Sequence, residues 1–213
     1  MGVVTGLAAI KQHVENSQGG GDLKWLKLKA GESVKVTFLQ EIDPDSPNYN
    51  EDAGLVIISP EHTNPGEGMF KHKAICTADE GACLPCELFE RGEKGWRVKG
   101  RLYANVLVDD GKTEPYVAIL SQGLSGKSIT PSLAAFAEDN GTITGYQFRI
   151  GRQGDAMKTE YSLTVIMNST GVDPSKYELF PLDKVVVKHV PYDEQAEFYQ
   201  VAQVAEASEG FTW

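Results

Sequence analysis

The chain has little cysteine and no long apolar run. Its three cysteines all lie between positions 76 and 86, and an odd, clustered set of thiols is unlike the disulfide framework of a small secreted domain. No segment approaches the roughly 20 apolar residues of a transmembrane helix, and the first residues lack the apolar stretch and cleavage site of a signal peptide. The sequence of 213 residues therefore predicts a cytoplasmic protein without a membrane segment, long enough to bury a core without disulfides.

The thiol cluster predicts a metal site. Cys83 and Cys86 form a Cys-x-x-Cys knuckle, which supplies two ligands from one tight turn, and Cys76 supplies a third. Thirteen residues separate His62 from Cys76, enough for the chain to leave a strand and return, whereas only three separate His72 from it. This spacing favours His62 as the fourth ligand and leaves His72 as the alternative. One His and three Cys leave no position for water or substrate, so we expect one structural zinc ion; three buried thiols without a metal are the plainer alternative.

Catalytic motifs are missing. A nucleobase deaminase pairs His-x-Glu with Pro-Cys-x-x-Cys, but Asn64 stands at the Glu position and Ala82 at the Pro position. The stretch SQGLSGKSIT resembles a phosphate-binding loop, but Ser121 replaces its first glycine. No nucleophile lies beside a base in the sequence, although a triad assembled only in space would leave no such mark. The sequence favours a protein that is not an enzyme.

Alternation of apolar and polar residues predicts a mainly β fold. The segment ESVKVTFLQEI places Val34, Val36 and Phe38 on one face. Residues 101–121 read as two strands around an Asp-Gly turn, which predicts a hairpin. Further strands are expected at 54–59, 142–151 and 160–168.

A helix is expected in ITPSLAAFAEDNG, with Thr130 as N-cap, Pro131 at its first position and Gly141 just past its end. No internal repeat is present, which excludes propellers and solenoids. Short strands, one or two short helices and an inserted metal module are typical of a small Greek-key barrel of the oligonucleotide-binding type, the OB-fold; a β-sandwich is the alternative. The expected parts are an N-terminal arm at 1–21, an OB-fold core at 22–191 with the zinc-binding insertion at about 60–95, and an acidic tail at 192–213.

The strand expected after the metal module carries a basic face. Arg97, Lys99, Arg101 and Tyr103 have the same parity and therefore share one side of the strand. A single strand of nucleic acid requires cations along its phosphates and a ring on which an unpaired base can stack. Further basic and aromatic residues extend the expected groove: Phe70, Lys71, Lys73, Arg149, Arg152 and Lys158. An ordinary solvated strand face is the alternative.

The net charge of −10 is unevenly distributed. Residues 192–213 contain no Lys or Arg, and their five carboxylates account for half of that charge: Asp193, Glu194, Glu197, Glu206 and Glu209. The rest of the chain can still carry a basic groove, because attraction depends on the local potential. We expect a free acidic tail that binds a partner protein through Phe211 and Trp213. The apolar spacing of residues 194–206 allows the alternative of a docked helix that buries Phe198, Val201 and Val204.

Four stretches carry a resemblance to a known family: WLKLKAGESVKVTFLQEIDPDSPNY, EHTNP, the cysteine cluster, and LYANVLVDDGKTEPYVAILSQGLSGKSITPS. Together they resemble the single-stranded-DNA-binding proteins of tailed phages that infect actinobacteria, over roughly residues 22–170. The ligand order His, Cys, Cys-x-x-Cys is more distantly similar to that of the helix-destabilising protein of T-even phages. The resemblance implies an OB-fold with a structural zinc held by His62, Cys76, Cys83 and Cys86, and location in the cytoplasm of the infected host.

The function implied by the resemblance is coating of single-stranded DNA during phage replication, recombination and repair, with replication or recombination proteins bound through the acidic tail. The DNA contacts do not follow from the resemblance and depend on strand parity alone. The alternative is a zinc-bearing adaptor that binds proteins and no nucleic acid. The basic, aromatic-tipped strand favours the first hypothesis, because an adaptor does not need such a face.

Overall fold

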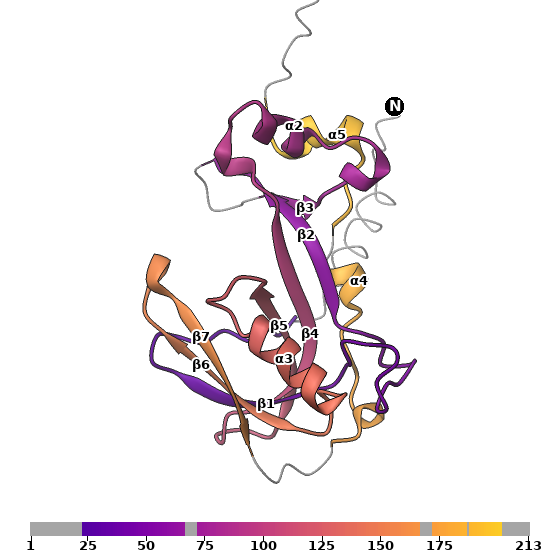
Figure 1. The fold of residues 1–213 in the computed structure, drawn as a ribbon, viewed down its shortest axis with the longest axis vertical. Helices are drawn as coiled ribbons and strands as arrows, with labels where there is room; N and C mark the ends of the chain where they lie inside the picture. Colours follow the sequence, from indigo (N-terminus) through magenta and orange to yellow (C-terminus); the bar gives the residue numbers. More distant parts are fainter. Residues whose placement is uncertain (1–22, 67–71, 167–171, 187, 202–213) are drawn as a thin grey trace, which may run out of the picture. The chain divides into compact units, whose positions relative to one another are not determined.

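The computed structural model describes residues 23–66, 72–166, 172–186 and 188–201 (Figure 1). Its strands are β1 (Ser33–Phe38), β2 (Ile57–Thr63), β3 (Lys73–Ile75), β4 (Lys99–Asp109), β5 (Tyr116–Gly123), β6 (Gln147–Gln153) and β7 (Glu160–Ile166). Its α-helices are α2 (Leu84–Glu90), α3 (Thr130–Asn140), α4 (Leu182–Val185) and α5 (Tyr192–Phe198). Short 3-10 helices occupy η1 (Ala78–Glu80), η2 (Lys94–Trp96), η3 (Ala156–Lys158) and η4 (Pro174–Lys176).

The chain forms two compact units. Among the described residues, unit 1 comprises 23–58, 102–166 and 172–186, and unit 2 comprises 59–66, 72–101 and 188–201. The strands β2 and β4 each contribute residues to both units. The metal module expected at about 60–95 corresponds to the first segment of unit 2, and the second segment comes from the C-terminal part of the chain.

The strands of unit 1 follow the spatial order β6-β1-β4-β5, with β7 paired to the outer edge of β6. The central strand β1 runs antiparallel to both neighbours, so that Val36 lies opposite Val108 of β4 and Phe148 of β6. Because β1 has the expected alternation, Val34, Val36 and Phe38 are buried. The prediction of a mainly β fold, with this strand and the β4-β5 hairpin, is confirmed.

The sheet is not closed among the described residues. Its path ends at β3 on one side and β7 on the other. The free edge of β5 is occupied by residues 24–26: Leu26 N–H donates to the Ile119 carbonyl over 2.9 Å, and Ile119 N–H donates to the Lys24 carbonyl over 2.7 Å. A single backbone hydrogen bond, from Tyr161 N–H to the Lys127 carbonyl at 2.9 Å, links the start of β7 to the segment after β5. The structure therefore does not confirm the predicted Greek-key barrel of the OB-fold type.

The helix α3 covers the core of unit 1 with Leu133 fully buried and Phe136 packed edge-to-face against Phe148, with ring centroids 5.1 Å apart. It begins one residue earlier than expected, since Thr130 is its first residue and donates its hydroxyl to the Gly123 carbonyl at 2.8 Å. The expected stop is confirmed: Gly141 has φ 72°, the left-handed conformation that glycine adopts without a Cβ penalty at helix ends.

Unit 1 also buries one carboxylate. Glu41, 2% exposed, follows β1 and accepts hydrogen bonds from the segment between α3 and β6. The donors are the Ile143 and Thr144 backbone N–H groups, each at 3.1 Å, and the hydroxyls of Thr142 and Thr144. Burial alone would raise the pKa of Glu41, but these hydrogen bonds outweigh it and hold the pKa below its usual value. The carboxylate therefore joins two loops of unit 1 in its ionised form.

Replacing Glu41 by Gln should lower the free energy of unfolding by about 2 kcal/mol at neutral pH, because an amide nitrogen would face hydrogen-bond donors. Since the folded-state pKa of Glu41 is depressed, its stabilisation is complete above the unfolded-state pKa and is lost as the pH falls through the folded-state pKa. Urea unfolding at several pH values should show the difference from wild type narrowing below about pH 4. The exposed Glu51→Gln is the matched control. A difference independent of pH would contradict this account.

Unit 2 has a core of its own. The hairpin of β2 and β3 pairs His62 with Ala74, and α2 and α5 lie side by side (Figure 1). Its buried apolar residues come from both chain segments: Ala74, Leu88, Trp96, Val190 and Tyr199. Each segment thus supplies part of this small core.

The predicted free tail from residue 192 is wrong for residues 192–201. Tyr199, at the end of α5, is 1% exposed and packs edge-to-face on Trp96, with ring centroids 5.2 Å apart. Phe198 and Val201 are partly buried against the same core, so the docked-helix alternative holds for them. Their apolar spacing outweighs the acidic composition, because the carboxylates of α5 lie on its exposed side. Val204 and the other residues after 201 lie outside the described part of the chain.

None of the helices in the described ranges has the length and apolar composition needed to cross a bilayer.

Candidate metal centre and basic surface

Two of the four expected ligands come from the β2-β3 hairpin of unit 2. His62 lies opposite Ala74, and the ladder continues past β3 with a hydrogen bond from Cys76 N–H to the Pro60 carbonyl at 2.8 Å. His62 and Cys76 are therefore diagonal neighbours on one face of the hairpin, close enough for their side chains to meet.

The other two ligands come from the start of α2. Cys83 is the N-cap residue in an extended conformation, and Cys86 is the third residue of the helix. The loop that brings them to the hairpin is closed by Thr77, whose hydroxyl donates to the Ala82 carbonyl at 2.6 Å. A turn of helix follows Cys83 directly, so the knuckle presents both sulfurs on the same side.

The four ligand atoms converge. His62 Nε2 lies 3.3 Å from Cys86 Sγ, and Cys76 Sγ lies 3.5 Å from Cys86 Sγ and 3.8 Å from Cys83 Sγ. All four atoms lie within 4.8 Å of one another. A disulfide needs about 2.05 Å, whereas a tetrahedron with metal–sulfur bonds of about 2.3 Å has edges of roughly 3.8 Å. The cluster could therefore hold a metal ion at its centre.

The neighbours of His62 keep its imidazole in the tautomer and charge state that bind a metal ion. His62 Nδ1 lies 2.7 Å from the Trp96 carbonyl, which can only accept, so Nδ1 carries the proton and the lone pair of Nε2 points to the sulfurs. Burial lowers the pKa of His62 below its usual value, although the Trp96 hydrogen bond opposes the shift, and the ring stays neutral near pH 7. A neutral imidazole is the form that binds metals.

Burial has the opposite effect on the pKa of two of the thiols. It raises the pKa of Cys76 and of Cys86, and the neighbouring thiols raise that of Cys86 further. Without a cation these sulfurs are protonated and gain little from their proximity. A bound metal ion would hold them as thiolates and offset the cost of placing them together.

Several contacts fix Trp96 in the position from which its carbonyl accepts the hydrogen bond of His62. The Trp96 ring is buried, its indole N–H donates to Glu93 at 3.2 Å, and the preceding Gly95 lies against Pro65 so closely that an added Cβ would come within 2.5 Å of the proline Cβ. Gly95 is thus required for a close approach of two chain segments. Nothing in the sequence pattern identified Trp96 or Gly95 as part of the site.

His72, the alternative ligand, does not reach the cluster. Its ring stacks on Phe198 with centroids 5.0 Å apart. The structure brings together His62, Cys76, Cys83 and Cys86, as the spacing predicts.

We predict one tightly bound metal ion per chain after purification without chelator, measured by native mass spectrometry. His62→Ala and Cys86→Ser should lose it, and His72→Ala should retain it, because only the first two remove ligands. The variants without metal should also melt earlier, by roughly 2–4 °C for each kcal/mol of stability removed, since a metal bound only by the folded chain adds to its stability. Retention of metal by Cys86→Ser would contradict the ligand assignment.

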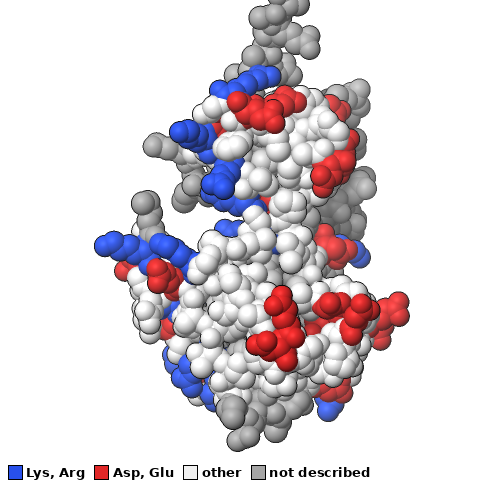
Figure 2. Space-filling model, viewed as in Figure 1, with Lys and Arg blue, Asp and Glu red and all other residues white. Residues whose placement is uncertain are grey.

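The basic run of the sequence is exposed. Side chains of Lys94, Arg97, Lys99 and Arg101 all lie at the surface of unit 2, at η2 and the start of β4. Within the described ranges no carboxylate forms an ion pair with the first three. Figure 2 shows Lys and Arg gathered along one flank of the part that carries β3, α2 and α5. Lys94 belongs to this surface but was not predicted, although the absence of acidic residues from 94 to 108 indicates it.

Tyr103 is not on the exposed face, and the prediction that it stacks on a base is wrong. Its ring is 0% exposed and meets Trp25 edge-to-face, with centroids 6.3 Å apart. From Leu102 to Val108, β4 is buried on both faces because it lies inside the sheet between β1, β2 and β5. From residue 102 onward, strand parity therefore no longer distinguishes buried from exposed side chains of β4.

Two predicted cations are engaged within the protein. Lys73 pairs with the buried Glu61 at 3.2 Å. Arg152 is half-buried on the same face of β6 as Ile150, and its guanidinium donates to the Leu28 carbonyl at 2.6 Å and to the Thr159 hydroxyl at 3.5 Å. The parity of β6, with Phe148 and Ile150 buried, indicates this inward direction for Arg152.

The remaining predicted contacts belong to unit 1 or fall outside the described residues. Arg149 and Lys158 are exposed in unit 1, at β6 and η3. Phe70, Lys71, Phe211 and Trp213 fall outside the described ranges.

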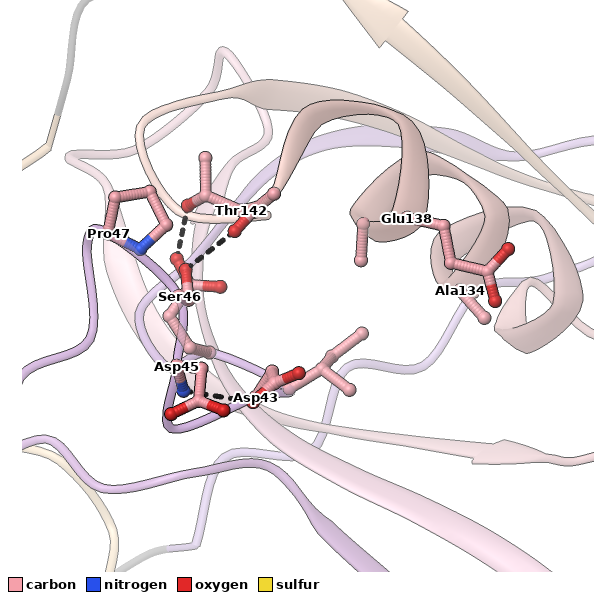
Figure 3. Close-up of a pocket in the computed structure, with 11 residues that line it drawn as sticks. Asp43, Asp45, Ser46, Pro47, Ala134, Glu138 and Thr142 are labelled. Atoms are coloured by element: carbon pink, nitrogen blue, oxygen red, sulfur yellow. Dashed lines mark hydrogen bonds between the residues drawn. The ribbon is translucent and has the colours of Figure 1, made fainter.

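Unit 1 also has an acidic pocket of about 470 Å³ (Figure 3). Its wall includes Ala134 on α3 and Pro47 on the loop after β1, and the carboxylates of Asp43, Asp45 and Glu138 stand around it. Three carboxylates repel a phosphate backbone, so this pocket is not suited to nucleic acid.

Comparisons of the chain with known protein families, with curated proteins and with solved structures give no match in any of the three. The resemblance to phage single-stranded-DNA-binding proteins stays a hypothesis.

Proposed function

We propose that this protein binds single-stranded DNA, without catalysis, through the exposed basic run of unit 2. The observation that carries the proposal is the concentration of Lys94, Arg97, Lys99 and Arg101 in eight residues, in a chain whose net charge is −10. An exposed cation cluster in an acidic protein attracts polyanions locally, and binding to phosphates releases their counterions. A single strand fits better than a duplex, because Val98, 42% exposed between these cations, offers apolar contact to an unpaired base.

The metal ion in this proposal is zinc. Three thiolates and one imidazole are ligands that zinc prefers, and four of them close a tetrahedral site without room for a substrate. The metal would fix the knuckle and the His62 strand, and through the Trp96 carbonyl it would fix the start of the basic run. Zinc would thus support binding without contacting DNA.

The strand order supports an OB-fold interpretation of unit 1. Three strands that follow one another in this unit, β1, β4 and β5, lie side by side, and β6 returns beside β1, which is the Greek-key order. The helix α3 stands between the third and fourth strands. An OB-fold is a partly open five-stranded Greek-key barrel, so an open sheet of this order is compatible with it. In this proposal the protein coats single strands during phage DNA replication, recombination and repair.

Replacing Lys94, Arg97 and Lys99 by Ala should weaken binding to labelled oligo-dT roughly tenfold at moderate salt and lower the salt slope by about 0.7 for each phosphate that the variant no longer neutralises. Fluorescence anisotropy across a salt series measures both. The matched control replaces Lys112, Lys176 and Lys184, three exposed lysines of unit 1, and changes the net charge equally. The control should bind as wild type does.

Three outcomes would contradict the proposal. Equal weakening by the control would show that only net charge matters, and the basic run would then be ordinary solvated surface. Equal affinity of the wild type for oligo-dT and for a duplex of the same length would contradict the preference for single strands. Absence of binding to either DNA would favour the adaptor hypothesis.

A further inference from the structure

The C-terminal segment of unit 2, Lys188–Val201, contacts the elements that carry the four ligands. It joins the first segment at β3, where Ile75 N–H donates to the Lys188 carbonyl at 2.9 Å. It continues along α2, where the Tyr192 hydroxyl donates to Glu87 at 2.7 Å. Near its C-terminal end, the Tyr199 carbonyl accepts a hydrogen bond from the Asn64 side chain at 2.6 Å. The segment thus touches the hairpin and the knuckle, the two elements that carry the ligands.

One side chain of this segment reaches the loops of the thiols directly. Gln195 is 1% exposed, and its Oε1 accepts the backbone N–H of Leu84, the residue after Cys83, at 2.8 Å. Its Nε2 donates to Thr77 Oγ1, next to Cys76, at 2.8 Å and to the Val190 carbonyl at 2.9 Å. The amide therefore bridges the two chain segments that present the sulfurs.

The Gln195 amide supplies a hydrogen-bond acceptor that the start of α2 lacks. The first N–H groups of a helix have no partner within it, and the N-cap side chain usually accepts one of them. Here the N-cap residue is Cys83, whose side chain makes no capping hydrogen bond because its sulfur belongs to the cluster, and Pro85 has no N–H. Gln195 supplies the missing acceptor to Leu84 from outside the helix.

Only an amide satisfies all three partners. Leu84 N–H requires an acceptor, whereas the Val190 carbonyl requires a donor, and Thr77 Oγ1 already gives its own hydrogen to the Ala82 carbonyl. Glutamine has an acceptor and a donor on one group, and glutamate has acceptors alone.

From these contacts we infer that Gln195 is a positioning residue of the metal centre and that docking of Lys188–Val201 is linked to metal occupancy. The inference rests on the metal ion proposed above. When the segment is docked, it holds the ligand loops in the geometry that binds the ion. When the ion is bound, it holds the same loops in the geometry on which the segment docks. Linkage of this kind is reciprocal, so removal of the metal loosens the docked segment.

The test compares full-length wild type with Gln195→Glu and Gln195→Met. The first keeps the shape and loses the donor, and the second keeps the approximate volume and loses both hydrogen-bonding functions. The control, Glu194→Gln, exchanges carboxylate for amide at the exposed neighbour on the same helix. Zinc transfer to a chromogenic chelator gives the release rate, and cobalt substitution reports the ligand geometry through its thiolate charge-transfer bands.

Both Gln195 variants should release zinc roughly 10- to 100-fold faster than wild type, with altered cobalt bands, while the control should match wild type. Should Gln195→Glu fail to fold, Gln195→Met decides. Folded Gln195 variants with the wild-type release rate and cobalt spectrum would overturn the inference, even if their melting temperatures were lower.

Limited proteolysis tests the reverse direction of the linkage, the effect of the metal on docking of the segment. Metal-stripped wild type should be cut within residues 188–201 faster than the metal-loaded protein, and equal cutting would overturn the linkage. Metal analysis of the wild type distinguishes failure of the metal proposal from failure of the linkage to Gln195. A wild type purified without metal overturns the metal proposal and this inference together, whereas metal-loaded wild type with unaffected Gln195 variants overturns this inference alone.

Discussion

The close approach of three cysteine sulfurs is the physical constraint that unit 2 has to satisfy. Cys76, Cys83 and Cys86 approach one another to the spacing of a coordination tetrahedron, and burial raises the pKa of Cys76 and Cys86. Neutral thiols are weak hydrogen-bonding partners and gain little from such proximity, whereas thiolates around a cation gain much. The apolar core of this unit is small, so the metal ion would supply a large share of the free energy that keeps the hairpin, the knuckle and the C-terminal helix together.

The metal centre and the basic surface share a support in the chain. Trp96 binds His62 through its carbonyl and packs on Tyr199 through its ring, and the exposed cations begin on either side of it. A change in the ligand cluster would therefore alter the anchoring of Lys94 and Arg97, two cations of the proposed DNA-binding surface. Unit 1 carries the opposite charge around its pocket, where Asp43 and Asp45 stand (Figure 3). The basic surface is suited to anionic partners, and the acidic pocket is suited to cationic ones.

Local patterns predicted the features that depend on few residues. Strand alternation identified β1 and the β4-β5 hairpin, and loop length between ligands distinguished His62 from His72. Prediction failed where long-range packing decides. Tyr103 follows the parity of Arg101 but lies in a part of β4 enclosed on both faces, and sequence alone does not show where a strand becomes central. Residues 192–201 read as acidic, yet Tyr199 and Gln195 find partners more than a hundred residues earlier.

Hydrogen exchange of backbone amides, measured on the full chain with and without its metal, tests the dependence of unit 2 on the metal centre most directly. Chelation should remove protection from amides of β3, α2 and α5, while amides of β1 and β6 in unit 1 should keep theirs, because the two units have separate cores. Unchanged protection of α2 and α5, in a chain shown by its mass to be free of metal, would contradict that dependence.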